Sequence, residues 1–350
     1  MRRHSEAGFT LLELLLVVAI LSSLALAATT FVDNADNQER FEVTRSRLEQ
    51  IRFAVVGDSR RTANGQAELS GFVADMGRLP NNLEELLSRP NDCDPDMNGI
   101  QTCAWSFGET GGIWRGWRGP YLDTLTGRDG SRKFLDGWGN VWGRFEISAN
   151  RELVVQSKGA DGVGNPSVTA QYLAQNDYEK DFPRSPDTSP NQLPEPLIIR
   201  EDYELTLTDS FGKGGLTVNL VKPYDGTCAT PNETKTNKAA CEAAGGTWTF
   251  STYSLCLRLY YRKHGTTAFL DADNNGTVNV TKDGNNEIVT LRFPNNTTVP
   301  IGMATVDVRT DDTGSPNSCL AIVKSAGALA LPVLFASRAA TALISIQLIP

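Results

Sequence analysis

Histidine is scarce in this sequence, and the motifs of common enzymes are missing. The 350 residues include two histidines, His4 and His264. The sequence contains no G-x-x-x-x-G-K-[ST] phosphate loop, no H-E-x-x-H zinc motif and no G-x-S-x-G nucleophile elbow. A hydrolase triad would have to use His264, in an Arg-Lys-His-Gly stretch that is typical of the end of a strand. We therefore expect a protein that is not an enzyme.

Basic residues are outnumbered by acidic ones. Lys and Arg total 33, Asp and Glu total 41, and the net charge is −8. This excess disfavours nucleic acid as a partner, although it leaves room for a local basic patch. The six cysteines include no C-x-x-C pair, which disfavours a zinc ribbon or a thioredoxin-like site. Their even number is typical of disulfides formed in an oxidising outer compartment.

Proline and glycine are absent from residues 9–56, and residues 9–28 carry one charge, that of Glu13. As a helix, this apolar run would be about 30 Å long, enough to cross the hydrocarbon core of a bilayer. A carboxylate at the bilayer centre costs about 2.5–3.5 kcal/mol, so we expect Glu13 to need a partner. Because Arg2 and Arg3 precede the run, the positive-inside rule predicts a cytoplasmic leader, with the rest of the chain outside.

The residues Gly8-Phe9-Thr10-Leu11-Leu12-Glu13 resemble the class III leader of type IV pilins and type II secretion pseudopilins. The resemblance implies that a prepilin peptidase cuts between Gly8 and Phe9 and methylates the new N-terminus. It also implies that Glu13 pairs with the N-terminal amine of Phe9 in a neighbouring subunit, which is an assembly contact. The implied partners are other pilin-like subunits, the peptidase and an inner-membrane assembly platform.

Two other interpretations of the N-terminus compete. A secretory signal peptide would use Ala25-Leu26-Ala27 as its cleavage site, although such a peptide has no use for Glu13. A plain membrane anchor would not require these residues at these offsets. N-terminal sequencing distinguishes the three, because the chain would start at Phe9, at Ala28 or at Met1.

Residues 9–57 are predicted to form one long helix. Apolar residues recur at helical spacing in its second half, at Phe41, Leu48, Ile51 and Val55, and we expect this stripe to pack on a globular domain. The first half would lie in the membrane or in a filament core. Two separate helices, broken at the polar residues 33–37, are the alternative.

Residues 58–181 are predicted to form a small α+β domain of the pseudopilin type. Gly-Arg-Leu-Pro at 77–80, residues 116–122 and the Asp-Gly-Trp-Gly-Asn stretch at 136–140 resemble landmarks of major pseudopilins, with Gly137 in place of a proline. The glycines are expected to supply turn conformations. Five of the six tryptophans fall within residues 105–142; such a cluster could bind sugar, but packing the small sheet on the helix is favoured.

Calcium is a candidate cofactor. Ser-Lys-Gly-Ala-Asp-Gly at 157–162 resembles the start of the pseudopilin calcium loop, which makes Asp161 a candidate ligand, with Asp177 or Asp181 as the second carboxylate. The family's usual residues are replaced at 163–166, so a solvated loop is the alternative. Residues 271–277 match the front half of a D-x-D-x-N-G loop, but a β-turn explains them better.

The last part of the chain has a different composition. Residues 182–196 are rich in proline and are predicted to be a semi-rigid linker. Residues 197–350 contain short segments of alternating apolar and polar residues, which predict a β-sandwich. The expected strands lie at 203–208, 216–221, 254–261, 288–293, 304–309 and 342–348. A local Cys93–Cys103 disulfide is expected, and Cys228, Cys241, Cys256 and Cys319 can form two more whose pairing stays open.

The predicted fold is therefore α+β, with a long N-terminal helix packed on a small antiparallel sheet, as in pilins, and then a β-sandwich. The expected parts are a leader (1–8), a transmembrane or filament helix (9–57), a pseudopilin-type domain (58–181), a linker (182–196) and the sandwich (197–350). The expected function is a structural, minor subunit of a type IV pilus or a type II secretion pseudopilus. It would wait in the inner membrane as a single-pass protein. The alternative is a filament-borne adhesin or cargo-binding module that uses the sandwich.

Overall fold

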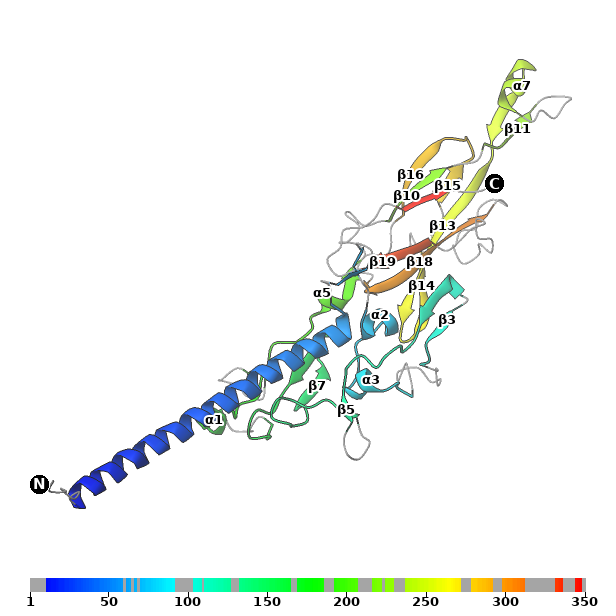
Figure 1. Cartoon of the computed structure of the whole chain (residues 1–350). Coiled ribbons are helices and arrows are strands. Elements are labelled where there is room, and N and C mark those ends of the chain that lie inside the picture. Colours follow the sequence, from blue (N-terminus) through cyan, green and yellow to red (C-terminus); the bar gives the residue numbers. More distant parts are fainter. Residues whose placement is uncertain are drawn as a thin grey trace, which may run out of the picture. The chain divides into compact units, whose positions relative to one another are not determined.

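A computed structural model of the chain shows a long helix, short helices and many strands (Figure 1). The structure describes residues 11–58, 61–63, 66–67, 70–91, 103–108, 110–126, 132–164, 169–185, 192–206, 216–221, 224–229, 237–271, 278–291, 298–311, 331–335 and 344–347. The contacts divide the chain into two units. Unit 1 comprises Met1–Glu49, Phe134–Arg144 and Val155–Glu195, and unit 2 comprises Gln50–Lys133, Phe145–Val154 and Pro196–Pro350.

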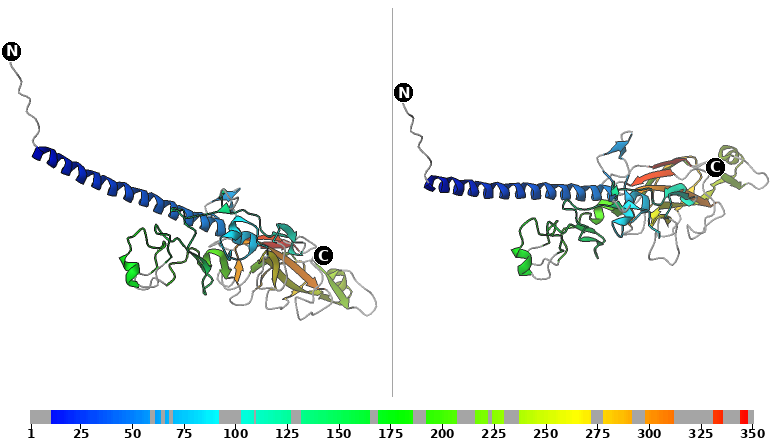
Figure 2. Two further views of the ribbon diagram at one scale, coloured as in Figure 1. Left: turned by 90° about the horizontal axis from the view of Figure 1, so that it is seen from below. Right: turned by 60° about the horizontal axis from the view of Figure 1, so that its bottom comes forward.

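The helix α1 (Leu11–Val56) runs for 46 residues, and it is unbroken in every view (Figures 1 and 2). The prediction of one long helix is confirmed, because no proline or glycine interrupts its hydrogen bonding. Three positions of the predicted apolar stripe are buried, with Leu48 5% exposed and Ile51 and Val55 0% exposed, and Phe41 is partly buried.

Within unit 1, the ring of Phe41 on α1 packs edge-on against Phe182, with 4.5 Å between the ring centroids. Ser157 and Phe182 form a β-bridge, so the chain on either side of the 158–181 loop is joined at its base. The helix α4 (Thr169–Ala174) lies in this loop and buries Tyr172 completely. Unit 1 is thus a helix with a loop packed on its side.

Unit 2 begins with short elements in the part that resembles pseudopilins. The helices are α2 (Phe72–Met76), α3 (Glu84–Leu87) and the 3-10 helix η1 (Thr110–Gly112). The amide oxygen of Asn82, one residue before the N-cap Leu83 of α3, accepts a hydrogen bond from the backbone of Glu85 at 3.1 Å. The strand pairs are β1 (Thr62–Ala63) with β2 (Gln66–Ala67), β3 (Ser106–Gly108) with β4 (Ile113–Arg115), β5 (Leu125–Thr126) with β6 (Arg132–Lys133), and β7 (Arg144–Ile147) with β8 (Leu153–Gln156).

The C-terminal part is rich in strands. The largest sheet has the order β14-β13-β18-β19, with β15 also paired to β13, and a second sheet has the order β16-β10-β20. In the second sheet β10 and β20 are parallel. The bounds are α5 (Arg200–Tyr203), β9 (Glu204–Thr206), β10 (Leu216–Val221), β11 (Gly226–Ala229), α7 (Lys238–Ala243), β12 (Thr247–Phe250), β13 (Thr252–Lys263), β14 (Thr266–Asp271), β15 (Val278–Thr281), β16 (Asn286–Leu291), β17 (Thr298–Pro300), β18 (Gly302–Asp311), β19 (Leu331–Phe335) and β20 (Ile344–Gln347).

The α+β class is confirmed, and every expected C-terminal strand overlaps an observed one. Unit 2 also contains residues from two domains that were expected to be separate, the one at 58–181 and the one at 197–350. The backbone N–H of Gly265, in the β13–β14 turn, donates to the carbonyl of Met76 in α2, at 2.7 Å. On β13, the Nε of Arg262 donates to the carbonyl of Trp114 in β4, at 2.6 Å. The expected domain boundaries stay a prediction.

Candidate functional site

The N-terminal part of α1 exposes apolar side chains over its whole circumference. Every side chain at residues 11–26 is exposed, and the large apolar ones range from 45% exposed at Val17 to 81% at Leu11. An apolar surface of this extent marks a membrane or a protein-protein contact. Within the described part of the chain, no helix meets the length and apolarity needed to cross a membrane.

The polar residues of this segment suit an apolar environment. The hydroxyl of Ser22 donates to the carbonyl of Val18, and that of Ser23 to the carbonyl of Ile20, each at 2.8 Å. Both hydroxyls are therefore satisfied by their own helix, as polar groups in hydrocarbon must be. Glu13 lies in the first turn of α1, where the helix dipole favours a negative charge. The predicted processing residues Gly8 and Phe9 lie outside the described residues.

The Asp-Gly-Trp-Gly-Asn stretch folds around the carboxylate of Asp136, which is 1% exposed. One of its oxygens accepts hydrogen bonds from the backbone of Trp138, at 3.0 Å, and of Asn140, at 2.7 Å. The other oxygen accepts from the hydroxyl of Ser157 at 2.5 Å. A buried carboxylate needs such donors, so these bonds fix the turn and tie it to the start of the 158–181 loop.

The same turn is held closely against α1. Arg47 donates to the carbonyl of Asp136 at 2.7 Å, and the backbone of Gly137 donates to the hydroxyl of Thr44 at 2.9 Å. A Cβ at Gly137 would lie 2.0 Å from the carbonyl oxygen of Arg40. The turn conformation expected at this glycine occurs at Gly139 instead, where φ is +87°. Gly137 is needed for close approach to the helix.

Two of the three candidate calcium ligands are engaged by protein donors. Asp161 accepts hydrogen bonds from the side chain of Gln175, at 2.9 Å, and from the backbone of Val163, at 2.9 Å. Asp177 forms an ion pair with Arg184 at 2.9 Å, and Asp181 is buried. No group of three or more potential metal ligands occurs among the residues that the structure describes. Of the second motif, residues 272–277 lie outside that part of the chain, so calcium binding stays a prediction.

The structure settles one of the open disulfide pairings. Cys228 on β11 is bonded to Cys241 on α7. Cys103 is also in a disulfide, and its expected partner Cys93 lies outside the described residues. Cys256 belongs to β13 with its side chain undescribed, and Cys319 lies outside the described ranges. The Cys228–Cys241 bond fastens α7 to the β11–β12 hairpin.

Unit 2 contains a charged cluster that no sequence motif indicated. Asp75 is 2% exposed and forms an ion pair with Arg118 at 3.2 Å, and a longer contact with Arg262 at 3.7 Å. The hydroxyl of Tyr121 donates to the same carboxylate at 3.0 Å. Burial raises the pKa of Asp75 from 3.8, although both guanidiniums act in the opposite direction. Burial likewise raises the pKa of Tyr121 and lowers that of Arg262.

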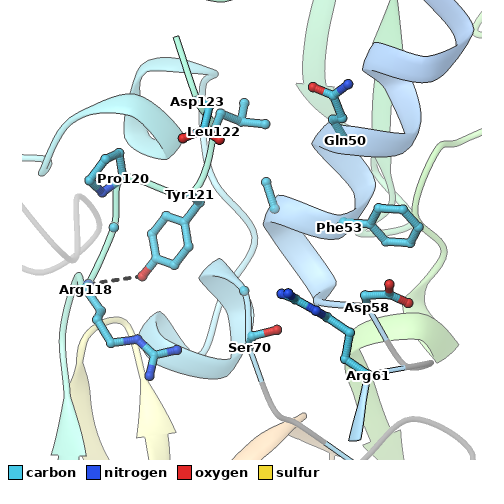
Figure 3. A pocket seen from close by; sticks show the side chains of 13 residues that line it. Gln50, Phe53, Asp58, Arg61, Ser70, Arg118, Pro120, Tyr121, Leu122 and Asp123 are labelled. Carbon is cyan, nitrogen blue, oxygen red and sulfur yellow. Dashed lines mark hydrogen bonds between the residues drawn. The ribbon is translucent and has the colours of Figure 1, made fainter.

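A cavity of about 460 Å³ adjoins this cluster, between the end of α1 and residues 118–123 (Figure 3). Phe53 and Arg61 line one wall, and Tyr121 lines the other. Arg118 belongs to both the cavity and the cluster. No local signal in the sequence points to this arrangement, because α2, residues 118–121 and β13 are far apart along the chain.

Comparison with protein families identifies one match. Residues 3–29 match the prokaryotic N-terminal methylation motif. This motif is the signature of type IV pilins and pseudopilins, and it confirms the resemblance drawn from residues 8–13. Neither the curated proteins nor the solved structures contain a match to the chain. The motif covers the leader and the exposed apolar start of α1, and it identifies a pilin-like N-terminus.

Proposed function

We propose that this chain, whose N-terminal methylation motif marks a pilin-like subunit, is a minor structural subunit of a type IV pilus or a type II secretion pseudopilus. The observation that carries the proposal is the exposed apolar surface of residues 11–26, which lies within the matched motif. A surface of this kind is stable in water only when a bilayer or other subunits cover it. The motif points to a structural protein rather than an enzyme.

Processing would prepare this helix for assembly. A prepilin peptidase would cut after Gly8 and methylate the amine of Phe9, and the subunit would wait in the inner membrane with α1 as its anchor. An assembly platform would then transfer the subunit from the bilayer into the filament. Each Leu, Ile or Val buried there contributes about 1.5–3 kcal/mol relative to water. The transfer from lipid to filament exchanges one apolar environment for another.

Glu13 would set the register of the helices in the filament. A carboxylate in an apolar core is costly, and an amine placed beside it offsets much of that cost. The new amine of Phe9 in a neighbouring subunit would supply this charge. Because α1 lacks proline and glycine, the helix would enter the filament without a kink.

A minor role fits the size of unit 2. The β-rich part at residues 197–350 adds bulk beyond a small pseudopilin-type domain, which disfavours dense packing of many identical copies. The proposal is tested by Glu13→Ala, with Glu13→Gln as a neutral isosteric variant and Glu39→Ala, also on α1, as the control. We expect Glu13→Ala and Glu13→Gln to be processed normally but to be lost from sheared filaments, and Glu39→Ala to assemble. Normal assembly of Glu13→Ala would refute the pairing.

A further inference from the structure

The β3–β4 hairpin carries three aromatic side chains that we name the aromatic face: Trp105, Phe107 and Trp114. Phe107 and Trp114 are directly opposite each other in the two strands, and their ring centroids are 5.6 Å apart. Trp105 stacks on Trp114 at 6.0 Å, with an interplanar angle of 14°. Phe107 is 51% exposed and Trp114 is 49% exposed. Large rings half in solvent are candidates for ligand contact.

These rings are not the core of the hairpin. Ile113 is the neighbour of Trp114 along β4, and it is 1% exposed. Since successive side chains of a strand point to opposite sides, the hairpin buries the Ile113 side and leaves the aromatic face outward. Other tryptophans have structural roles: the indole N–H of Trp117 donates to the carbonyl of Glu85 at 2.7 Å. The aromatic face therefore requires a different explanation from packing.

Positive charge borders the aromatic face. The guanidiniums of Arg118 and Arg262 each lie 5.4 Å from the ring centroid of Trp105. Asp75 contacts both guanidiniums but is 2% exposed, whereas the side chain of Arg118 is 49% exposed. Solvent therefore meets the side chain of Arg118 and not the carboxylate that pairs with it. The site is complementary to an anionic ligand with apolar faces.

The cavity continues from the same arginine. Arg118 lines the cavity of about 460 Å³, a volume typical of small-molecule sites. Its other charged lining residues are Arg61, Asp58 and Asp123. Figure 3 shows Arg61 and Arg118 on facing sides of this space. A ligand that stacks on Trp105 or Trp114 can thus place a charged substituent beside Arg118.

We propose that the aromatic face and Arg118 form a binding site for an acidic oligosaccharide, one whose sugar rings carry carboxylates. The C–H face of a sugar ring would cover the indole of Trp114, which removes apolar surface from water. A carboxylate on the sugar would accept hydrogen bonds from Arg118, and Asp75 with Tyr121 holds that side chain in place. This site binds the ligand whether or not the chain is in a filament.

A stable protein partner fits this surface less well. With rings of about 150–250 Å² each and about half of each exposed, Phe107 and Trp114 together offer about 150–250 Å². A stable protein interface buries about 800 Å² on each partner. The aromatic face has the size of one or two sugar rings, and the adjoining guanidinium selects for acidic ones.

Isothermal titration calorimetry of the full-length chain in detergent micelles tests the proposal, with tetragalacturonate as the acidic probe and maltotetraose as the neutral one. We expect tetragalacturonate to bind, with an affinity that falls as salt is raised, and maltotetraose to bind at least about tenfold more weakly. Trp114→Ala should weaken binding of tetragalacturonate about tenfold, and Phe107→Ala by a smaller factor. Tyr224→Ala removes a ring that is 52% exposed elsewhere in unit 2, and it should leave the affinity unchanged.

Three results would overturn the proposal. The first is no heat from tetragalacturonate at millimolar concentrations. The second is an affinity that neither Trp114→Ala nor Phe107→Ala changes, with the far-UV circular dichroism spectrum of each variant confirming its fold. The third is self-association of the chain that is abolished by Trp114→Ala but is not changed by either sugar. This result would assign the aromatic face to contact between copies of the chain.

Discussion

Three glycines of unit 1 allow the docking of the Asp136–Asn140 turn on α1 to be tested by matched substitutions. Gly137→Ala introduces a Cβ that would lie 2.0 Å from the carbonyl oxygen of Arg40 and 2.7 Å from the hydroxyl of Thr44. Both contacts are shorter than any carbon–oxygen contact allows, and the carbonyl of Arg40 belongs to the helix backbone, which cannot rotate aside. The turn must therefore move away from the helix.

The expected cost follows from the bonds that this movement breaks. The hydrogen bond from Gly137 to Thr44 contributes about 0.5–1.5 kcal/mol, and the charged bonds from Arg47 to the turn contribute about 1.5–3 kcal/mol each when intact. Because these bonds would weaken rather than vanish, we expect Gly137→Ala to destabilise the docked turn by about 2–4 kcal/mol.

Two control variants separate steric clash from backbone strain. Gly139 has φ of +87° and no atom within 4 Å of a built Cβ, so Gly139→Ala should cost about 1–2 kcal/mol through strain alone. Gly164 has open space and no positive φ, so Gly164→Ala should be neutral or slightly stabilising.

Native-state hydrogen exchange of residues 134–144 reads the effect locally. This is preferable to a global melting curve because the chain has two units. We expect protection of these amides to fall most in Gly137→Ala, less in Gly139→Ala and not at all in Gly164→Ala. Equal protection in Gly137→Ala and Gly164→Ala would refute the steric reasoning.

Three further predictions concern other groups. The raised pKa of Asp75 means that the folded chain binds the carboxyl proton more tightly than the unfolded chain does. The stabilisation from this proton is full below pH 3.8 and is lost as the pH rises through the raised pKa. Asp75→Asn should therefore flatten the pH dependence of Tm in this range, and an unchanged slope would contradict this prediction. Cys228→Ser removes a disulfide whose two cysteines are separated by 13 in sequence, so amide hydrogen exchange in β11 and β12 should accelerate. The expected loss of local stability is about 3 kcal/mol, and unchanged exchange would argue against a stabilising role of the disulfide. Calcium at the predicted site would displace the protein donors that engage Asp161 and Asp177, and it should raise Tm more than magnesium does; an equal effect of the two ions would argue against the site.

Local patterns predicted the long helix α1 and six of the C-terminal strands. The absence of proline and glycine from residues 9–56 predicts α1, and its apolar stripe predicts the buried positions of Leu48, Ile51 and Val55. Strands such as β10 follow from the alternation of Leu216 to Val221. These features depend on neighbours in sequence, so the sequence is sufficient to predict them.

Contacts between distant segments were beyond such patterns. Arg262 donates to the carbonyl of Ala74, which is 188 residues away, and the same side chain faces Asp75. The helix α7 was also missed, because it is six residues long and lies between two expected strands, at 216–221 and 254–261. Its cap at Asn237, which accepts a hydrogen bond from Ala240 at 2.8 Å, is a signal that could have identified it.

The packing of unit 2 limits one test of the alternative function, a filament-borne adhesin or cargo-binding module. Deleting residues 197–350 would separate a structural role from adhesion or cargo binding only if the remaining chain kept its fold. The deletion would remove β13, whose Arg262 contacts Trp114 and Ala74, so loss of assembly would have two explanations. Point substitutions on exposed residues, such as Tyr224→Ala, leave these contacts in place.

The mass of the mature chain, purified from sheared filaments, tests the central proposal most directly. We expect a chain that starts at Phe9 and carries one methyl group on its N-terminal amine, recovered with the other filament subunits. A chain that starts at Met1 or at Ala28, or one that is missing from filaments although it is processed at Phe9, would contradict it.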